Sequence, residues 1–297
     1  MTQKEARRAY ASMVSVIEVP ILNDKYWSKV PELAVDAIML DLEDSAAPST
    51  KAAARDAIVA ALREPDYFGG RRIIVRCNNL ASPWGRDDLE ALAAVDTDFV
   101  VSYPKLDEVD ELDAVAGILE AGGRRRGLHV MIETPRALTE VDRVAAHAAV
   151  DGLHYGYVDL AAEMGSRPFD DDGALSELTT GYARSRIAVA AAAHGLFATG
   201  GSLIPDYKDT TKVAQLVRTW ADLGYTACIA VTPAHLPIIN EVMRPSPSAV
   251  ERARATSSAY ESALSEGKPA AVVDGRVVTM PDYRVAQLVL ERAGIRD

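Results

Sequence analysis

Short apolar runs rich in β-branched residues recur along this chain and alternate with longer segments whose apolar residues follow helical spacing. Most of the runs are continuously apolar, which is typical of strands buried on both faces of a parallel sheet. The predicted strands lie at residues 14–20, 37–43, 73–78, 99–105, 129–135, 153–158, 196–201 and 227–233. The segments between them predict helices, for example over residues 49–63 and 107–121.

Eight strands that alternate with helices predict an α/β fold, a (β/α)8 TIM barrel closed by right-handed crossovers. An open, doubly wound sheet is the alternative. No Gly-x-Gly-x-x-Gly follows the first strand, which disfavours the dinucleotide-binding version of that sheet. The length of 297 residues leaves room for one barrel of about 250 residues and an extension.

The pattern changes after residue 244, where Arg-Pro-Ser-Pro-Ser forms a turn-rich break. A helix over 249–265, a hairpin with its turn at Asp274–Gly275 and a final helix are predicted beyond it. We therefore expect a catalytic barrel domain at residues 1–244 and a C-terminal extension at residues 245–297. So short an extension builds little core of its own, so it must pack on its own barrel or on a neighbouring subunit, and we expect the neighbouring subunit.

The charge balance narrows the choice of partners. The chain has 32 Lys and Arg against 43 Asp and Glu, a formal net charge of −11, which disfavours a nucleic-acid partner. The N-terminal residues lack a signal peptide's apolar region, and the most apolar stretch, 187–201, is too short for a membrane span. Cys77 and Cys228 lie in apolar runs and predict no disulfide framework. We expect a cytoplasmic protein without a membrane or nucleic-acid partner.

Polar residues follow the predicted strands at the end where a barrel carries its chemistry. Glu133 and Asp159 end neighbouring strands and supply the oxygen ligands that Mg²⁺ prefers. Arg76 suits a substrate carboxylate, because its planar guanidinium can bond both oxygens. The alternative interpretation of these residues is a set of structural ion pairs over the barrel mouth.

A second group of charges follows the second and fourth strands. Asp41, Glu43 and Asp44 form an acidic cluster, and Lys105 either adds positive charge to the mouth or supports that cluster.

The histidines and Ser202 carry no pattern that predicts catalysis. His129 and His154 lie at or near predicted strand starts, so we expect them to face the other end of the barrel. His194 and His235 lack metal-ligand spacing, and Ser202 lies in no Gly-x-Ser-x-Gly motif.

Several segments, in one order along the chain, carry a family resemblance: LDLEDSAAPSTKAAAR (40–55), IVRCNNLASPWGRDDL (74–89), PKLDEVDEL (104–112), MIETPRAL (131–138) and HYGYVDLAAEMG (154–165). They resemble the HpcH/HpaI aldolase and citrate lyase β-subunit family, most closely its citrate-lyase-β-like branch. The resemblance extends over residues 37–240, and DGRVV at 274–278 continues it into the extension.

The resemblance implies a lyase or aldolase that binds Mg²⁺, with Mn²⁺ as the alternative ion. Such an enzyme cleaves or forms a carbon–carbon bond next to a 2-oxo acid or a malyl- or citramalyl-type thioester of coenzyme A. The resemblance makes Glu133 and Asp159 the metal ligands. Arg76 then holds the 2-oxo acid, with Lys105 and Glu133 beside it. Glu43 and Asp44 are catalytic and order metal-bound water. The implied assembly is a homotrimer or hexamer whose extension reaches a neighbouring subunit's site.

The chain departs from the family pattern on one side of this site. Val14 and Ile21 stand where members commonly carry the Arg of Arg-Ser and the Gly of Val-Pro-Gly, and Thr232 stands in the His position of Ile-His-Pro. In the extension, Thr279 replaces the Asp that serves thioester-acting members as acid or base, a role that threonine does not fill near pH 7. Asp282 lies three positions on and could replace it only with a backbone shift.

We therefore expect a Mg²⁺-dependent carbon–carbon lyase or aldolase that works through a metal-stabilised enolate. Its second partner need not be a standard acyl-CoA. The alternatives are an HpcH/HpaI-type 2-oxo-acid aldolase without coenzyme A, a malyl-type thioesterase, and a metal-binding subunit without activity of its own.

Overall fold

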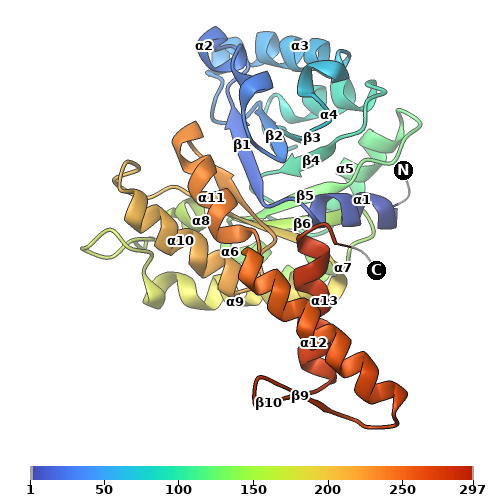
Figure 1. Cartoon of the computed structure of the whole chain (residues 1–297). Helices are drawn as coiled ribbons and strands as arrows, with labels where there is room; N and C mark the ends of the chain where they lie inside the picture. The colour runs from blue at the N-terminus through green and yellow to red at the C-terminus, as the bar shows by residue number, and fades with distance from the viewer. Residues whose placement is uncertain (1–2, 296–297) are drawn as a thin grey trace. The chain divides into compact units, whose positions relative to one another are not determined.

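The computed structural model describes residues 3–295, and the chain divides into two compact units with the boundary between Asn240 and Glu241. The first unit is a closed barrel of eight parallel strands in sequence order (Figure 1). The strands are β1 (Ser15–Val19), β2 (Ala37–Asp41), β3 (Arg72–Arg76), β4 (Val100–Tyr103), β5 (Leu128–Ile132), β6 (Val150–Tyr155), β7 (Phe197–Gly201) and β8 (Ala227–Ala230). The predicted (β/α)8 barrel is confirmed, and the doubly wound alternative is wrong because β8 pairs with β1.

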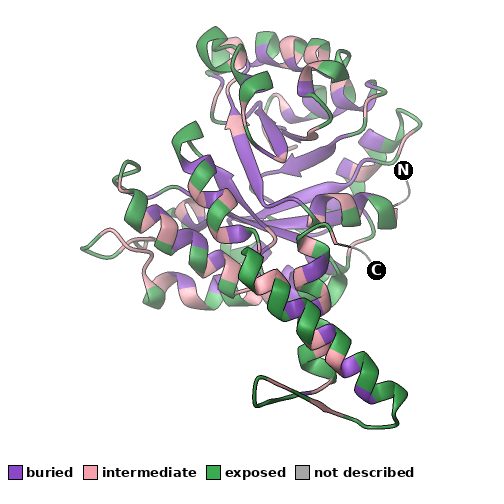
Figure 2. Ribbon diagram, viewed as in Figure 1, coloured by how far each residue is buried: buried purple, intermediate pink, exposed green. Residues whose placement is uncertain are grey.

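Helices surround this barrel, and nearly every strand residue is buried, as expected for strands covered on both faces (Figure 2). The longer helices are α1 (Gln3–Ala11), α3 (Lys51–Leu62), α4 (Gly85–Ala93), α5 (Glu111–Glu120), α9 (Glu177–His194), α10 (Thr210–Asp222) and α11 (Leu236–Met243). The shorter ones are α2 (Asp24–Trp27), α6 (Pro135–Thr139), α7 (Val141–Ala146) and α8 (Tyr157–Glu163). In the described part of the chain, no helix combines the length and the apolar character needed to cross a bilayer.

The N-terminal end of the barrel is filled by apolar side chains. Tyr10 of α1 stacks on Phe197 at 5.4 Å between ring centroids and donates its hydroxyl to the carbonyl oxygen of Ile73. Met39 and Ile74 belong to the same buried cluster. Helix α1 therefore covers this end, and the opposite end remains for the site.

Two histidines lie inside the barrel, not at an end of it. His129 Nε2 and His154 Nδ1 lie 2.9 Å and 2.8 Å from the hydroxyl of Thr199, and His129 Nδ1 lies 3.2 Å from that of Ser102. Burial lowers the pKa of His129 to about 3 and the pKa of His154 well below its usual value. The expectation that His154 lies near a strand start is wrong, because β6 begins three residues earlier than predicted.

The second unit is a helix–hairpin–helix, as predicted. It consists of α12 (Pro247–Ser265), β9 (Ala271–Val273), β10 (Arg276–Val278) and α13 (Met280–Arg292). Asp274 and Gly275 both adopt positive φ at the turn, as a tight two-residue hairpin requires. The helices pack through Ala253, Ala286 and Leu290.

Candidate active site

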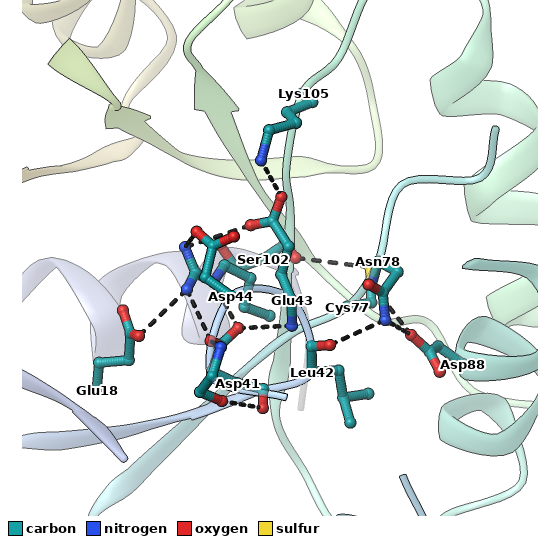
Figure 3. Close-up of polar contacts among 12 residues, drawn as sticks. Glu18, Asp41, Leu42, Glu43, Asp44, Cys77, Asn78, Asp88, Ser102 and Lys105 are labelled. Carbon is teal, nitrogen blue, oxygen red and sulfur yellow. Dashed lines mark hydrogen bonds and ion pairs between the residues drawn. The ribbon is translucent and has the colours of Figure 1, made fainter. Parts of the chain in front are cut away.

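The C-terminal ends of β2 and β3 are joined by a buried ion pair (Figure 3). Arg76 and Asp41 are register partners at these strand ends. Arg76 Nε and Nη2 lie 2.6 Å and 2.7 Å from the two oxygens of Asp41, a bidentate arrangement. Asp41 is fully buried and also accepts the backbone N–H groups of Glu43 and Ser45. Burial raises the pKa of Asp41, but the hydrogen bonds and charge of Arg76 outweigh it and hold that pKa below its usual value.

The loop after β2 is held in place by a buried ammonium group. Lys51 Nζ, at the start of α3, lies 2.7 Å from the carbonyl oxygen of Leu42 and also donates to that of Glu43. It further donates to Asn78 Oδ1 at 2.8 Å, and Asn78 is fixed by Asp88. Because these bonds satisfy the loop carbonyls, the side chain of Glu43 is presented at a defined place.

Glu43 lies between two cations. Its Oε1 pairs with Lys105 Nζ, and its Oε2 lies 3.3 Å from Arg76 Nη1. Asp44, whose side chain is 66% exposed, lies 3.6 Å from the same Nη1. Burial raises the pKa of Glu43, although Arg76 and Lys105 oppose the shift. These residues form one connected charge cluster around Arg76.

Lys105 connects this cluster to Glu133. It adopts a left-handed conformation with φ of 49°, which is uncommon for a residue other than glycine and costs conformational energy. In this conformation its backbone N–H donates to Glu133 Oε1 at 2.7 Å while its ammonium group pairs with Glu43. The side chain of Asn79 donates to the carbonyl oxygen of Lys105 at 2.9 Å and so helps to hold the conformation.

Glu133 is a buried carboxyl group beside a second acid. It follows β5 and is 1% exposed, and the hydrogen bond it accepts comes from a backbone N–H and not from a cation. Burial, followed by the charges of Glu43 and Asp159, raises its pKa to about 8. Asp159 is half-buried in the first turn of α8. A β-carbon at Gly156 would lie 2.5 Å from Glu133 Oε2, so only glycine leaves room for this carboxyl group.

This pair of acids fits a divalent cation. A buried carboxylate next to another acid is stabilised by a cation, and Mg²⁺ takes few protein carboxylates and fills its other positions with water or substrate. No group of three or more His, Cys, Asp or Glu residues suited to a metal exists among residues 3–295. A metal held by Glu133 and Asp159 would leave its other positions to water or substrate.

A cavity of about 480 Å³ adjoins the cluster on the side of β1 and β8. Glu18 of β1 belongs to its lining, and Glu18 Oε1 lies 3.1 Å from Arg76 Nη2. Tyr26, Lys29, Tyr207 and Thr232 are further lining residues. The cavity therefore reaches Glu18, and Glu18 in turn contacts the guanidinium of Arg76.

His235 fixes one wall of this cavity. Its Nε2 lies 2.7 Å from the carbonyl oxygen of Tyr207, so Nε2 carries the proton and Nδ1 accepts from the hydroxyl of Ser202 at 2.8 Å. Ser202 Oγ in turn accepts the N–H of Val231 at 3.2 Å. His235 and Ser202 therefore connect the segments that carry the lining residues.

In the extension, Thr279 and Asp282 bond to each other. The backbone N–H and the hydroxyl of Thr279 both donate to Asp282 Oδ2, at 2.8 Å and 2.7 Å, in the capping box that begins α13. These bonds lower the pKa of Asp282. Asp282 therefore has a structural role at its own helix.

The family is shown by comparison with known proteins. The family model described as HpcH/HpaI aldolase/citrate lyase matches residues 15–233. This chain belongs to the HpcH/HpaI aldolase/citrate lyase family. A (3S)-malyl-CoA thioesterase of Cereibacter sphaeroides is 34% identical over 279 residues, 94% of each chain. An L-malyl-CoA/β-methylmalyl-CoA lyase of Rhodobacter capsulatus is 31% identical over 90% of each.

A solved member of similar structure comes from Mycobacterium tuberculosis. It is the protein CitE in complex with magnesium, acetoacetate and coenzyme A, with a TM-score of 0.79 and 27% identity over 96% of this chain and 99% of that chain. The citrate lyase β subunit of the same organism, complexed with oxaloacetate and magnesium, matches with a TM-score of 0.68 and 26% identity over 80% of this chain and 99% of that chain. The family resemblance stated from the sequence is therefore confirmed.

The structure brings the predicted site residues of this family member to one barrel mouth. Arg76, Glu43, Asp44 and Lys105 form the connected charge cluster, and Glu133 joins it through the backbone of Lys105. The sequence interpretation missed several residues that position them, namely Glu18, Lys51, Asn79, Gly156 and His235. Of these, Glu18 had a visible signal, because it is the one acid in the apolar run of residues 14–20.

Proposed function

We propose that this chain is a Mg²⁺-dependent carbon–carbon lyase. Its substrate is a malyl- or citramalyl-type thioester of coenzyme A, and cleavage of a carbon–carbon bond in this substrate releases a 2-oxo acid. The observation that carries the proposal is the environment of Glu133. This carboxyl group is 1% exposed, its charge is opposed by burial and by the charges of Glu43 and Asp159, and within residues 3–295 no ion pair balances it. Such a group is arranged for a cation. The magnesium in the CitE structures supports the choice of ion.

The charge balance of the mouth also supports a metal. Six carboxyl groups and two cations meet here: Glu18, Asp41, Glu43, Asp44, Glu133 and Asp159 with Arg76 and Lys105. A 2-oxo acid brings further negative charge. Its binding requires added positive charge between the acid and Glu133, which a divalent ion supplies.

Each residue of the mouth then has a defined task. Glu133 and Asp159 would hold the ion, which would supply positive charge where negative charge develops as the carbon–carbon bond breaks. Arg76 binds and orients the carboxylate of the 2-oxo acid, so that the bond to be broken has a fixed direction. Lys105 keeps Glu43 in place, and Glu43 and Asp44 orient water at the mouth.

The cavity on the side of β1 and β8 accommodates the thioester arm in this proposal. Its lining combines the aromatic Tyr26 and Tyr207 with the cationic Lys29, a set that suits an extended arm ending in phosphates. Coenzyme A is bound in the CitE complex, which supports an acyl-CoA substrate for this chain.

Hydrolysis of the thioester is the second candidate function. The 34% identity to a (3S)-malyl-CoA thioesterase favours it, as does Thr279 in place of an acid or base in the extension. The two candidates share the substrate and differ in the bond that breaks.

Product analysis distinguishes the candidates. The purified chain is incubated with Mg²⁺ and malyl-CoA, citramalyl-CoA or free 4-hydroxy-2-oxo acids, and the products are identified by mass spectrometry. The lyase proposal predicts acetyl-CoA and glyoxylate from malyl-CoA, whereas a thioesterase releases malate and free coenzyme A. Pyruvate from the free acids alone indicates an aldolase without coenzyme A. No turnover of any substrate contradicts the enzyme proposal and leaves a metal-binding subunit.

We also propose that the protein is a homotrimer or hexamer. Val272, Val277, Val285 and Leu288 of the second unit are large apolar side chains that are more than half exposed in the single chain. Burial of such side chains favours association. Light scattering coupled to size-exclusion chromatography measures the mass, and a monomer would contradict this part of the proposal.

A further inference from the structure

Glu18 is an acid in a strand whose other residues are apolar or small. Strand β1 reads Ser-Val-Ile-Glu-Val, and its other four residues are buried. The side chain of Glu18 is 30% exposed, lines the cavity and reaches Arg76 Nη2 at 3.1 Å. Placing an acid in such a strand costs free energy because the carboxyl group loses hydration. The presence of Glu18 next to Arg76 therefore suggests a role other than packing.

All three nitrogen atoms of the guanidinium of Arg76 face carboxylates of the protein itself. Nε faces Asp41, Nη2 faces Asp41 and Glu18, and Nη1 faces Glu43 and Asp44. A substrate carboxylate can therefore bind Arg76 only by replacing one of these groups.

The four carboxylates differ in how firmly they are held. Asp41 is fully buried and accepts two backbone N–H groups in addition to Arg76. Glu43 is held by Lys105. Asp44 is exposed and lies 3.6 Å from Nη1. Glu18 alone among them both bonds to Arg76 and borders the cavity, so it has room to move when a ligand arrives from that side.

We propose that Glu18 occupies the carboxylate-binding position on Arg76 until a 2-oxo acid arrives from the cavity, and that Glu18 gives up this position by taking a proton from solvent. The inference rests on the proposed function, because it assigns Arg76 to the acid. Glu18 is then a specificity-determining residue, since only a ligand that bonds the guanidinium better than a carboxyl group can replace it.

The charges around Glu18 explain the coupling to a proton. Arg76 of β3 favours its charged form, whereas Asp41 and Asp44 of β2 and the following loop oppose it. Lys29, Tyr26 and Tyr207 are the titratable groups of the cavity lining, and β8 and its following residues contribute the uncharged Val231 and Thr232. Burial and the two acids raise the pKa of Glu18, and Arg76 lowers it. Burial is the largest of these effects, and the resulting pKa is about 7. An incoming carboxylate adds another negative charge and drives the remaining proton uptake.

Calorimetric titration with pyruvate tests the proposal. Pyruvate is titrated into the full chain at saturating Mg²⁺, at pH of about 6 and about 8, in two buffers that differ in ionisation enthalpy. For the unmodified protein we expect binding about tenfold weaker at the higher pH, with uptake of close to one proton there. We expect Glu18→Gln, which imitates the protonated side chain, to bind equally at both pH values without proton uptake. Glu32→Gln removes an exposed acid of the same type and should retain the behaviour of the unmodified protein.

The outcomes separate the two hypotheses. Pyruvate binding by Glu18→Gln with the original pH dependence and proton uptake would overturn the role of Glu18 and leave the proposed function intact. Failure of both the unmodified protein and Glu18→Gln to bind pyruvate at either pH would contradict the proposed function, and the inference with it. Circular dichroism and thermal unfolding establish that each variant is folded.

Discussion

The barrel mouth has two sides that are built by different means. On the side of β2 to β6, three carboxyl groups are held by hydrogen bonds or an ion pair: Asp41 by two backbone N–H groups, Glu43 by Lys105, and Glu133 by the backbone N–H of Lys105. On the side of β1 and β8, a cavity is lined by partly exposed side chains such as Tyr26 and Tyr207. In the proposed function the first side performs the chemistry that all substrates share, whereas the second accommodates the variable arm of the substrate.

The departures from the family pattern within the barrel lie on the side of β1 and β8. Thr232 lines the cavity, and Ile21 lies just beyond the end of β1. The segments that carry Arg76, Glu133 and Asp159 keep the family motifs. We therefore expect changes on the side of β1 and β8 to alter which substrate binds, and changes on the other side to alter whether the carbon–carbon bond is broken.

The largest expected effect is that of Glu133→Gln. The substitution keeps the shape of the side chain and removes one proposed metal ligand, so we expect Mg²⁺ binding to be lost and kcat to fall about 1000-fold. Thermal stability should be unchanged or higher, because a buried carboxyl group with a raised pKa disfavours folding at neutral pH. Calorimetric titration with Mg²⁺ and differential scanning fluorimetry measure both effects. Retained Mg²⁺ affinity would contradict the assignment.

The next effect is expected from Gly156→Ala. The new methyl group would lie 2.5 Å from Glu133 Oε2, so Glu133 must move, and we expect kcat to fall about 100-fold. Gly117→Ala in α5 is the matched control, because a β-carbon there meets nothing within 4 Å. That control should raise stability by about 0.5–1 kcal/mol without affecting kcat. Equal kcat values for Gly156→Ala and Gly117→Ala would show that catalysis does not depend on the position of Glu133.

Two lysine variants compare the sides of the mouth directly. Lys105→Gln removes the cationic partner of Glu43, and we expect kcat to fall about tenfold or more with little change in KM for the thioester. Lys29→Gln alters only the cavity lining, and we expect KM for the thioester to rise several-fold with kcat preserved. Steady-state kinetics with malyl-CoA measures both constants. If the two variants exchange these effects, the division of the mouth is wrong.

The smallest effect concerns the barrel interior beneath the site. His129 and His154 have pKa values below the unfolded value of about 6.5, so the unfolded chain binds more protons at acidic pH. The free energy of unfolding should therefore fall by about 1 kcal/mol per pH unit for each histidine as the pH drops below 6.5. Chemical unfolding at a series of pH values measures the slope, and His154→Gln should reduce it. An unchanged slope in that variant would assign the acid sensitivity to other groups.

The sequence carried enough information for the fold and for the side of the mouth that keeps the family motifs. Continuous apolar runs identify buried parallel strands, and residues at the strand ends are brought together by closure of the barrel alone. This is why Arg76, Glu43 and Lys105 could be placed at one mouth from their positions in the sequence.

The supporting residues depend on three-dimensional contacts that no local pattern reveals. The left-handed backbone of Lys105 and the space that Gly156 leaves for Glu133 arise from neighbouring segments in the folded chain. Lys51 begins a helix in the sequence, yet it is buried because loop carbonyls surround its ammonium group. The same holds for His235, whose two bonds join segments about 30 residues away in the sequence.

A crystal structure of the protein with Mg²⁺ and pyruvate tests the central claim most directly. We expect one ion at about 2.1 Å from an oxygen of Glu133 and an oxygen of Asp159, with the carboxylate of pyruvate on Arg76. An ion bound elsewhere while Glu133 keeps only its backbone hydrogen bond, or pyruvate seated away from Arg76, would contradict this account of the site.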